Sequence, residues 1–369
     1  MPNISSPCPP SPNMPHRQGP YAPDGGPSGW GEGIEWPDWR ELVAGARVVS
    51  IPMPVRFRGI TIREALLVRG PAGWGEFAPF NEYGDEESSR WLLSAMEAGW
   101  AGWPEPRRDR IAVNATVPAV PASEVASVLA RFPGARTAKV KVAEPGQNLR
   151  EDVARVEAVR ELLGDDAQVR IDANAKWSMD DARAGLRALA GVRLEYAEQP
   201  VASVPEMAGL RSWLAGEGID VPIAADESIR KADDPITVAR AGAADIVIVK
   251  VAPLGGVRAA LAVAAECGLP TVVSSALDTS VGIRAGLALA AALPELDHAC
   301  GLGTIGLFSS DVADPPLLPS GGELRVGNLN VDEERLDALA APTDRRDWWL
   351  DRLRRCYTLL TSRKTRRRV

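Results

Sequence analysis

The sequence lacks the features that mark membrane and secreted proteins. No apolar run reaches the roughly 18 residues that a membrane-spanning helix needs, and the longest candidate, Ala285–Leu293, predicts a buried helix instead. The N-terminus also lacks a basic segment followed by an apolar core, which is the pattern of a signal peptide. We therefore predict neither a membrane span nor a secretory signal.

Cysteine and histidine are scarce, with four and two residues among 369. The cysteines form no CxxC pair, which argues against a zinc site or a disulfide framework and favours the reducing cytoplasm. His16 lies in a proline-rich stretch and His298 has no partner in sequence, so no zinc site is predicted. The cysteines are Cys8, Cys267, Cys300 and Cys356.

An excess of basic charge is also missing. The chain has 42 Lys and Arg against 49 Asp and Glu, a net charge of −7. Because nucleic-acid-binding proteins are usually basic, we do not expect nucleic acid as a partner. The short basic run Arg363–Arg368 predicts a solvated tail. The sequence leaves both a monomer and a homo-oligomer open.

The N-terminal part of the chain divides into two regions. Residues 1–36 predict a disordered leader, because nine prolines and four glycines fall in the first 30 residues and aliphatic side chains are almost absent. Residues 37–108 predict a small α+β region. Within it we expect strands at 46–53 and 61–70, a glycine-aromatic turn at 73–80 and an amphipathic helix at 86–100.

From residue 109 to 310 short apolar strands alternate with helices. Alternation of this kind indicates right-handed βαβ units and a parallel sheet. Eight strand candidates at intervals of about 25–30 residues predict an α/β fold of the closed (β/α)₈ barrel type. A doubly wound open sheet is the alternative, but its glycine-rich dinucleotide fingerprint is absent after the first strands. Residues 311–369 predict an irregular segment followed by a closing amphipathic helix.

Charged residues recur where the predicted barrel strands end. Lys139 and Lys141 share one face of a valine-rich strand, since side chains alternate along a strand. The next strand places Arg170, Asp172 and Asn174 on one face. The residues Lys141, Asp172, Glu198, Asp226 and Lys250 follow one another at intervals of 31, 26, 28 and 24 residues. Each interval is about one βα unit, so we expect these side chains to converge at the mouth of the barrel, where active sites lie in this fold.

The residue types at this mouth predict metal-assisted proton transfer. Three carboxylates repel one another in a barrel mouth, and a divalent cation resolves that repulsion. Ligands that are all oxygen favour Mg²⁺, so Asp172, Glu198 and Asp226 are predicted to bind it. A lysine acts as a base near neutral pH only when burial or a neighbouring ammonium lowers its pKa, and Lys139 is placed to do this to Lys141.

Several motifs of the predicted barrel resemble those of a known family. The set resembles the enolase superfamily in its muconate-lactonizing subgroup, and the segments AADESIRKADDP, SSALDTSVGI and HACGLGT look like those of actinobacterial o-succinylbenzoate synthases. The resemblance covers about residues 40–360. The motifs are KVK at 139–141, DAN at 172–174, EQP at 198–200, DES at 226–228 and VKVAPLGG at 249–256.

The resemblance implies a fold and a reaction. The fold would be a modified (β/α)₇β barrel closed by an α+β capping domain, to which the segment after the last barrel strand returns. The substrate would be a small carboxylate, 2-succinyl-6-hydroxy-2,4-cyclohexadiene-1-carboxylate, dehydrated to o-succinylbenzoate in menaquinone biosynthesis. Lys141 would remove the proton next to the carboxylate and then protonate the departing hydroxyl, and Lys250 would stabilise the enediolate from the opposite face.

The resemblance also implies supporting and substrate-binding residues. Arg56 and Arg58 lie in a segment similar to a cap loop that closes the pocket, and Ser274 and Ser275 end the seventh strand, where they could bond the succinyl group. Solvated hairpin charges and helix capping are the respective alternatives. Gly301 and Gly303 would permit close backbone approach at the eighth strand, although simple turns explain them equally. The supporting residues would be Lys139, Arg170, Asn174 and Glu227.

Two other functions fit parts of this pattern. An N-acylamino-acid racemase or a dipeptide epimerase would use the same two lysines as alternating bases around Mg²⁺. A barrel retained only as a binding or structural protein is disfavoured, because both lysines and all three carboxylates are intact.

Overall fold

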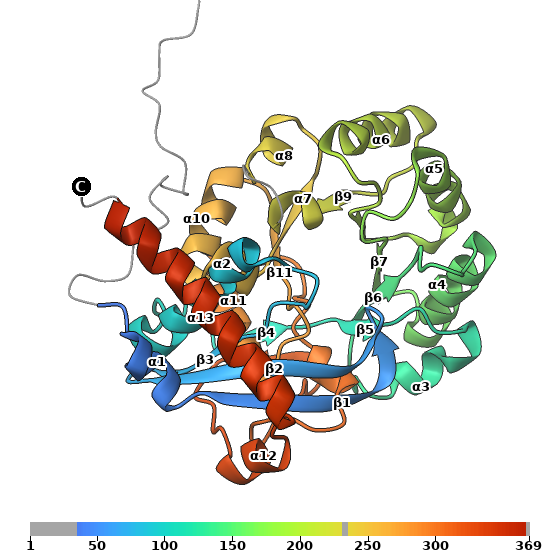
Figure 1. Cartoon of the computed structure of the whole chain (residues 1–369). Coiled ribbons are helices and arrows are strands. Elements are labelled where there is room, and N and C mark those ends of the chain that lie inside the picture. The colour runs from blue at the N-terminus through green and yellow to red at the C-terminus, as the bar shows by residue number, and fades with distance from the viewer. Residues whose placement is uncertain (1–34, 231–234, 367–369) are drawn as a thin grey trace, which may run out of the picture.

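The structure is a computed structural model that describes residues 35–230 and 235–366. The predicted leader therefore lies outside the described residues, apart from its last two positions. Figure 1 shows a parallel sheet surrounded by helices on one side and an antiparallel sheet crossed by a long C-terminal helix on the other. No helix in the described ranges is both long and apolar enough to cross a membrane.

The capping domain is built on a three-stranded antiparallel sheet with the order β1-β2-β3. The strands are β1 (Arg47–Phe57), β2 (Ile60–Gly70) and β3 (Gly73–Phe77). The expected glycine-aromatic turn at 73–80 is wrong, because Gly73–Phe77 pairs along β2. Its glycines are needed for close packing: a Cβ on Gly75 would lie 2.0 Å from the carbonyl oxygen of Ala95.

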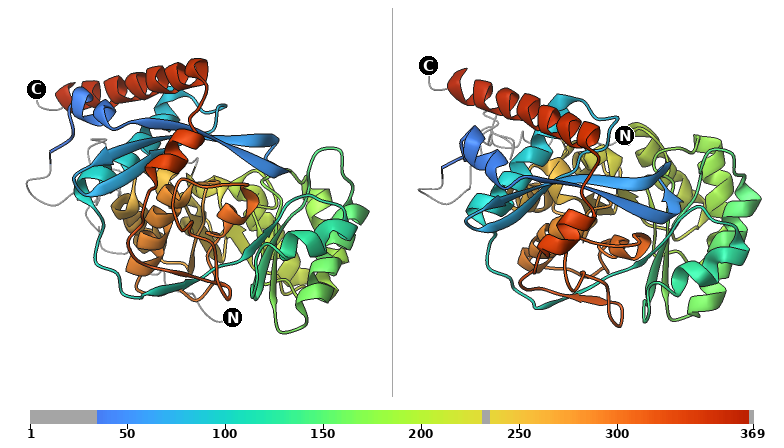
Figure 2. Two further views of the ribbon diagram at one scale, coloured as in Figure 1. Left: turned by 90° about the horizontal axis from the view of Figure 1, so that it is seen from below. Right: turned by 60° about the horizontal axis from the view of Figure 1, so that its bottom comes forward.

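Helices from both ends of the chain pack on this sheet. They are α1 (Trp39–Ala44), α2 (Asp85–Met96), a π-helical turn (Glu97–Ala101), α12 (Glu333–Ala338) and α13 (Thr343–Arg366). The predicted amphipathic helices are confirmed, since α2 buries Trp91 and Leu92 and α13 buries Trp349 and Leu353. Helix α13 lies along the cap in both views of Figure 2. It continues to Arg366, so the basic run begins within a helix.

The barrel sheet contains seven parallel strands in the order β11-β10-β9-β8-β7-β6-β5. The predicted eighth strand at 297–303 is wrong as a regular strand, because it forms only two parallel bridges, Cys300 with Val113 and Gly301 with Ser274. These bridges join the two edges of the sheet, so the predicted barrel is confirmed and an open doubly wound sheet is excluded. The strands are β5 (Ala115–Val117), β6 (Thr137–Lys141), β7 (Gln168–Asp172), β8 (Tyr196–Glu198), β9 (Ile223–Ala225), β10 (Ile246–Val249) and β11 (Thr271–Val273).

Helices follow the strands and form the outer layer. Their starting points are set locally: the side chains of Asn148, Ser178 and Ser203 each close a capping box with the acidic residue three positions later. The helices are α3 (Val125–Leu129), α4 (Leu149–Leu163), α5 (Met179–Ala188), α6 (Val204–Glu217), α7 (Glu227–Arg230), α8 (Thr237–Arg240), α9 (Val251–Leu254), α10 (Val257–Cys267) and α11 (Ser280–Ala292). Three short 3₁₀ turns span Ala122–Glu124, Ala190–Val192 and Thr304–Leu307.

The segment after the barrel is irregular, and its return to the cap remains a prediction. It contains one strand, β12 (Glu323–Arg325), which pairs antiparallel with β4 (Arg110–Ala112) at the start of the barrel. The domain limits at 37–108, 109–310 and 311–369 remain predictions.

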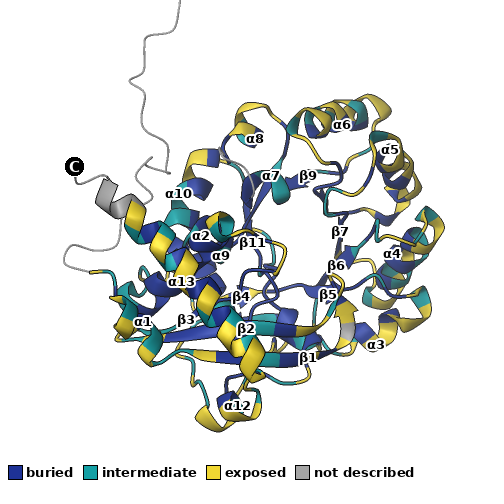
Figure 3. Ribbon diagram, viewed as in Figure 1, coloured by how far each residue is buried: buried dark blue, intermediate teal, exposed yellow. Residues whose placement is uncertain are grey.

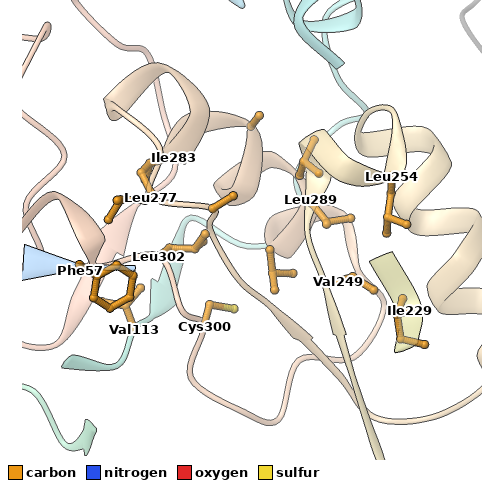
Figure 4. Packing of buried hydrophobic residues seen from close by; sticks show 14 of the residues in the cluster. Phe57, Val113, Ile229, Val249, Leu254, Leu277, Ile283, Leu289, Cys300 and Leu302 are labelled. Carbon is orange, nitrogen blue, oxygen red and sulfur yellow. The ribbon is translucent and has the colours of Figure 1, made fainter. Parts of the chain in front are cut away.

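The core lies on the outer face of the barrel strands, beneath the helices. Figure 3 shows the strands buried and the outward helix faces exposed. Apolar side chains fill the space between strand and helix, as Val249, Leu254 and Leu289 do in Figure 4. The opposite face of several strands points into the barrel and is freed from this packing, so it can carry the charged residues.

Two buried carboxylates of the cap fasten it to the barrel. Glu76 of β3 accepts hydrogen bonds from the backbone N–H groups of Thr279 and Gly282, at the start of α11, at 3.1 and 3.0 Å. Glu97 accepts in the same way from Val257 and Arg258 at the start of α10. A carboxylate at a helix N-terminus satisfies free N–H groups and interacts favourably with the helix dipole. The cap therefore docks on the same barrel segments that follow Lys250 and Ser274.

Candidate active site

Strand register brings the predicted charged residues to one end of the barrel. Lys141 of β6 lies directly opposite Asp172 of β7, and Asp172 lies opposite Glu198 of β8. Glu198 pairs with Ala224 of β9, and Asp226 follows two residues later on the same face. We call Lys139, Lys141, Asp172, Glu198, Asp226 and Lys250 the charged ring. The predicted convergence of these residues is thus seen in the register of neighbouring strands.

Lys139 lies inside the barrel and not in water. Its Nζ donates to both carboxylate oxygens of Glu198 at 2.9 Å and lies 3.3 Å from Oδ2 of Asp172. Although burial alone would lower the pKa of Lys139, the charges of Glu198 and Asp172 raise it above its ordinary value. Lys139 therefore remains a fixed positive charge beside Lys141.

Lys141 is the ring lysine whose pKa is lowered. Burial is the largest cause, and the positive charge of Lys139 acts in the same direction, while Asp172 opposes both. Its Nζ donates to Asp172 at 2.5 Å and to Oδ1 of Asn174 at 2.6 Å, and it lies 5.5 Å from the ring centre of Phe57. A lysine in such surroundings has the lowered proton affinity that a general base requires.

Lys250 reaches the site from β10, at the point where the strand gives way to α9. Its Nζ donates to Oδ2 of Asp226 at 2.5 Å, and both residues are buried. Asp226 keeps its pKa well below the ordinary range: burial would raise it, but Lys250 and Arg230 outweigh that effect. The site therefore holds a carboxylate and an ammonium on its β9–β10 side as well as on its β6–β7 side.

The three carboxylates have the chemistry of a site for a hard divalent cation. They lie on neighbouring strands, are buried, offer only oxygen, and Asp172 and Asp226 both raise the pKa of Glu198 in addition to its burial. Within residues 35–230 and 235–366, however, no three His, Cys, Asp or Glu side chains are grouped closely enough to hold a metal as placed. The carboxylates instead face the ring lysines, so their role as ligands remains a prediction.

Two buried residues hold the strand ends in place. Gln199 accepts hydrogen bonds from the backbone N–H groups of Asp226 and Ser228, at 3.0 and 3.1 Å. Arg155 of α4 donates to the carbonyl of Lys141 at 2.7 Å. The sequence analysis missed both roles. Gln199 could have been suspected from its place in the EQP motif, whereas nothing in the sequence linked Arg155 to Lys141.

Asn174 and Glu227, which the sequence analysis proposed as supporting residues, lie at the edge of the charged ring. Asn174 donates through Nδ2 to Oε1 of Glu227 at 3.3 Å, which connects the end of β7 to the start of α7. Glu227 also accepts from Nη2 of Arg230 at 2.7 Å. Arg230 is a buried residue of the site that the sequence analysis overlooked, because four residues after Asp226 it reads as an ordinary helix cation.

A narrow cavity of about 40 Å³ opens onto the charged ring. The predicted Ser274, Ser275 and Gly301 line it, while Gly303 does not. Ser275 Oγ donates to the carbonyl of Gly301 at 2.8 Å and lies 2.9 Å from the hydroxyl of Thr304. A glycine at position 301 lets this segment lie close to Ser274, since a Cβ there would lie 2.5 Å from Oγ of Ser274. Thr116 and Thr304 also line the cavity and were not predicted.

The two predicted arginines of the cap hairpin border a wider groove next to this cavity, and Arg58 lines the cavity as well. The groove has a volume of about 510 Å³ and reaches Lys141 at its inner end. Arg58 lies 4.1 Å above the ring of Phe80 and 3.6 Å from a carboxylate oxygen of Glu82. Arg56 donates from Nε to the carbonyl of Gly59 at 3.2 Å. Arg56 is thus placed at the entrance, whereas Arg58 lines both the groove and the cavity at the charged ring.

Arg170 is in the barrel but not in the site. Its guanidinium points to the opposite end, where it donates to Glu195 at 2.5 and 3.1 Å and to the carbonyl of Ala299 at 2.7 Å. Because it precedes Asp172 by two residues, it shares the inward face but lies one layer deeper. Face alternation alone could not show to which end the guanidinium extends.

Comparison with known proteins identifies relatives over most of the chain. A family model described as enolase C-terminal domain-like matches residues 122–330, and one described as enolase N-terminal domain-like matches residues 48–99. The o-succinylbenzoate synthase of Mycobacterium leprae is 58% identical over 325 residues, covering 88% of this chain and 95% of that protein. That of Mycobacterium tuberculosis strain H37Rv is 59% identical over 314 residues, covering 85% and 94%.

Solved structures with the same fold are more distant in sequence. Muconate lactonizing enzyme from Pseudomonas putida aligns with a TM-score of 0.65 at 22% identity, covering 80% of this chain and 98% of its own. N-succinyl Arg/Lys racemase from Bacillus cereus aligns with a TM-score of 0.67 at 20% identity, covering 80% and 97%. At these identities the likeness establishes the fold alone.

Proposed function

Because the chain belongs to the o-succinylbenzoate synthases of the enolase superfamily, we propose that its charged ring performs the reaction of that family. The chain is a hydro-lyase that converts 2-succinyl-6-hydroxy-2,4-cyclohexadiene-1-carboxylate to o-succinylbenzoate and water in menaquinone biosynthesis. One observation supports the assignment of roles: Lys141, Asp172 and Glu198 lie directly opposite one another on three neighbouring strands.

Lys141 acts as the base and then as the acid. In its neutral form it removes the proton from the carbon next to the ring carboxylate, and the resulting ammonium then protonates the departing hydroxyl. Burial lowers the pKa of Lys141, which favours the neutral form that the first step needs. Because one lysine serves both steps, the proton and the hydroxyl leave from the same face of the ring, which is a syn elimination.

Lys250 stabilises the charge that appears when the proton leaves. Its ammonium approaches from β10 while Lys141 approaches from β6, so the substrate ring lies between them. A positive charge held in a buried site stabilises a developing enediolate more strongly than it would in water. Lys139 keeps its proton, so it maintains the field that lowers the pKa of Lys141.

Members of the enolase superfamily generally use a divalent metal, and we propose that here it is Mg²⁺, held by Asp172, Glu198 and Asp226. The ion would supply positive charge to the substrate carboxylate and thereby acidify the neighbouring carbon. The oxygen-only donor set supports this choice. The succinyl group is proposed to contact Ser274, Ser275 and the glycine backbone near Gly301, with Arg58 lining both the cavity and the outer groove and Arg56 lining the groove alone. The buried cysteines Cys267, Cys300 and Cys356 are reduced thiols, which supports a cytoplasmic location.

A direct assay tests this function. The purified chain is incubated with the hydroxycyclohexadiene and Mg²⁺, and we expect aromatic absorbance to appear, to disappear with EDTA and to return with added Mg²⁺. N-succinylamino acids are assayed in parallel, because Lys141 and Lys250 could also serve as the two bases of a racemase. Racemisation that is faster than dehydration would overturn the assignment.

A further inference from the structure

Arg230 joins two segments of the molecule, residues 226–230 and the cap loop of Tyr83, at the edge of the active site. Its Nε donates to Oδ1 of Asp226 at 3.2 Å and its Nη2 to Oε1 of Glu227 at 2.7 Å. Its Nη1 donates to the hydroxyl of Tyr83, in the capping domain, at 3.0 Å. Arg230 is only 4% exposed, although its edge lines the cavity and the groove, so water has little access to these contacts. The side chain is therefore a buried link between the cap and the charged ring.

The same contacts divide the two oxygens of Asp226 between two cations. Oδ1 is held by Arg230, whereas Oδ2 faces Lys250 at 2.5 Å. A guanidinium is planar and keeps its proton throughout the accessible pH range. It therefore fixes the orientation of the carboxylate that it binds, whereas an ammonium does not. Since Gln199 also accepts a hydrogen bond from the backbone N–H of Asp226, this residue is held at its backbone as well as at its carboxylate.

Tyr83 is itself held by the C-terminal helix. Arg352 of α13 is buried and donates to the carbonyls of Tyr83 and Phe80 at 2.7 and 2.9 Å. The rings of Phe80 and Trp91 pack against Tyr83, with centroids 5.8 and 6.2 Å away. The phenol hydroxyl therefore reaches Arg230 from a loop whose position depends on α13.

We infer that Arg230 is a positioning residue that couples docking of the capping domain, through Tyr83 and α13, to the orientation of the Asp226 carboxylate. The inference rests on the proposed function, since it treats Asp226 as a ligand of the divalent cation. It predicts that a residue 143 positions away from Asp226 in sequence, Tyr83, changes the affinity of the site for the cation. Residues that support metal ligands in this way typically affect affinity or activity by about 10–100-fold.

Arg230→Lys tests the role while keeping the charge. One ammonium group cannot contact all three partners of Arg230. The orientation of the Asp226 carboxylate is then no longer fixed, but the local positive charge remains. We expect the Kd for Mn²⁺, measured by electron paramagnetic resonance without substrate, to rise about tenfold. We expect kcat to fall by a similar factor, with a smaller change in KM.

Tyr83→Phe tests the link to the cap. It removes one hydroxyl and should raise the Kd for Mn²⁺ about two- to fivefold, in the same direction as Arg230→Lys but less. The double variant should bind Mn²⁺ no more weakly than Arg230→Lys alone, because both changes interrupt one path. Tyr83→Phe keeps the ring in place, so it can be measured even if Arg230→Lys fails to fold.

Arg258→Lys is the matched control. Arg258 also connects a barrel helix to the cap, through Glu97 at 2.9 Å and the carbonyl of Gly102 at 2.8 Å, but contacts no member of the charged ring. We expect it to lower Tm and to leave the Kd for Mn²⁺ unchanged.

The outcomes separate this inference from the proposed function. If the unaltered chain neither binds Mn²⁺ nor forms o-succinylbenzoate, the proposed function fails. If the unaltered chain does both, but Arg230→Lys or Tyr83→Phe changes only Tm, as Arg258→Lys does, the positioning role is refuted. Additive effects of the two substitutions would refute the coupling through Tyr83.

Discussion

The two ends of the barrel pair their carboxylates mainly with different cations. At the mouth, lysines 139, 141 and 250 face Asp172, Glu198 and Asp226. At the opposite end, Arg170 holds Glu195 and stacks over Tyr196, 4.7 Å from the ring centre. An arginine keeps its proton in proteins, whereas the pKa of a buried lysine shifts readily. The arginine end can therefore stabilise the fold, while the lysine end can also transfer a proton.

Substituting Lys141 should have the largest effect at the lysine end. Lys141→Ala removes the base, and we expect kcat to fall by about 10²–10⁴-fold, the usual contribution of a positioned general base. Circular dichroism should show that the fold is retained, because Lys139 still pairs with Asp172 at 3.3 Å. Lys176→Ala is the control, since Lys176 borders the outer groove and pairs with Glu144. Substantial activity in Lys141→Ala would show that another group removes the proton.

Lys250 offers a way to separate charge stabilisation from proton transfer. Lys250→Ala should lower kcat by about 10²–10³-fold, as removal of one group that stabilises a developing anion does. Lys250→Arg keeps a charge that does not transfer protons, so it should retain more activity than Lys250→Ala. Steady-state kinetics on both variants measures this. Equal losses in the two variants would indicate that Lys250 itself transfers a proton, as in a racemase.

Substitution of Arg170, at the end of the barrel opposite the active site, should reduce the free energy of unfolding and leave kcat unchanged. Arg170→Met leaves Glu195 without its main partner, and breaking a buried ion pair in this way costs about 3–5 kcal/mol. Urea unfolding should show a free energy of unfolding lower by about 3 kcal/mol, because Glu195 remains partly reached by water. We expect kcat per folded molecule to stay the same. A folded Arg170→Met protein without activity would contradict the division between the two ends.

The smallest expected effect is on stability in acid. Burial would raise the pKa of Glu195, but hydrogen bonds from His298 and Arg170 outweigh it and lower the pKa to about 2 from an ordinary value of 4.5. Ionised Glu195 therefore stabilises the fold above about pH 4.5, and this contribution is lost as the pH falls toward about 2. Thermal unfolding of Glu195→Gln should show a shallower decrease of Tm over this range. An unchanged slope would argue against the ion pair.

Strand periodicity explains why the charged ring could be predicted. Lys139 and Lys141 share a face because side chains alternate, and the recurrence of charges once per βα unit placed Asp172, Glu198 and Asp226 on successive strands. The eighth strand was predicted but forms only bridges, which the alternation of apolar residues at 297–303 did not indicate. β3 was missed because its glycines indicate a turn locally, while their actual role is to let α2 pack closely.

The sequence alone determined which residues face the barrel interior and in what order they follow, because both depend on local periodicity and repeat length. Only the tertiary structure decided which of those residues meet. Arg170 extends away from Asp172 toward Glu195, and Arg230 reaches Tyr83 in a domain remote in sequence. The reason is physical: long flexible side chains choose partners by the packing of distant segments, and local sequence does not encode that packing.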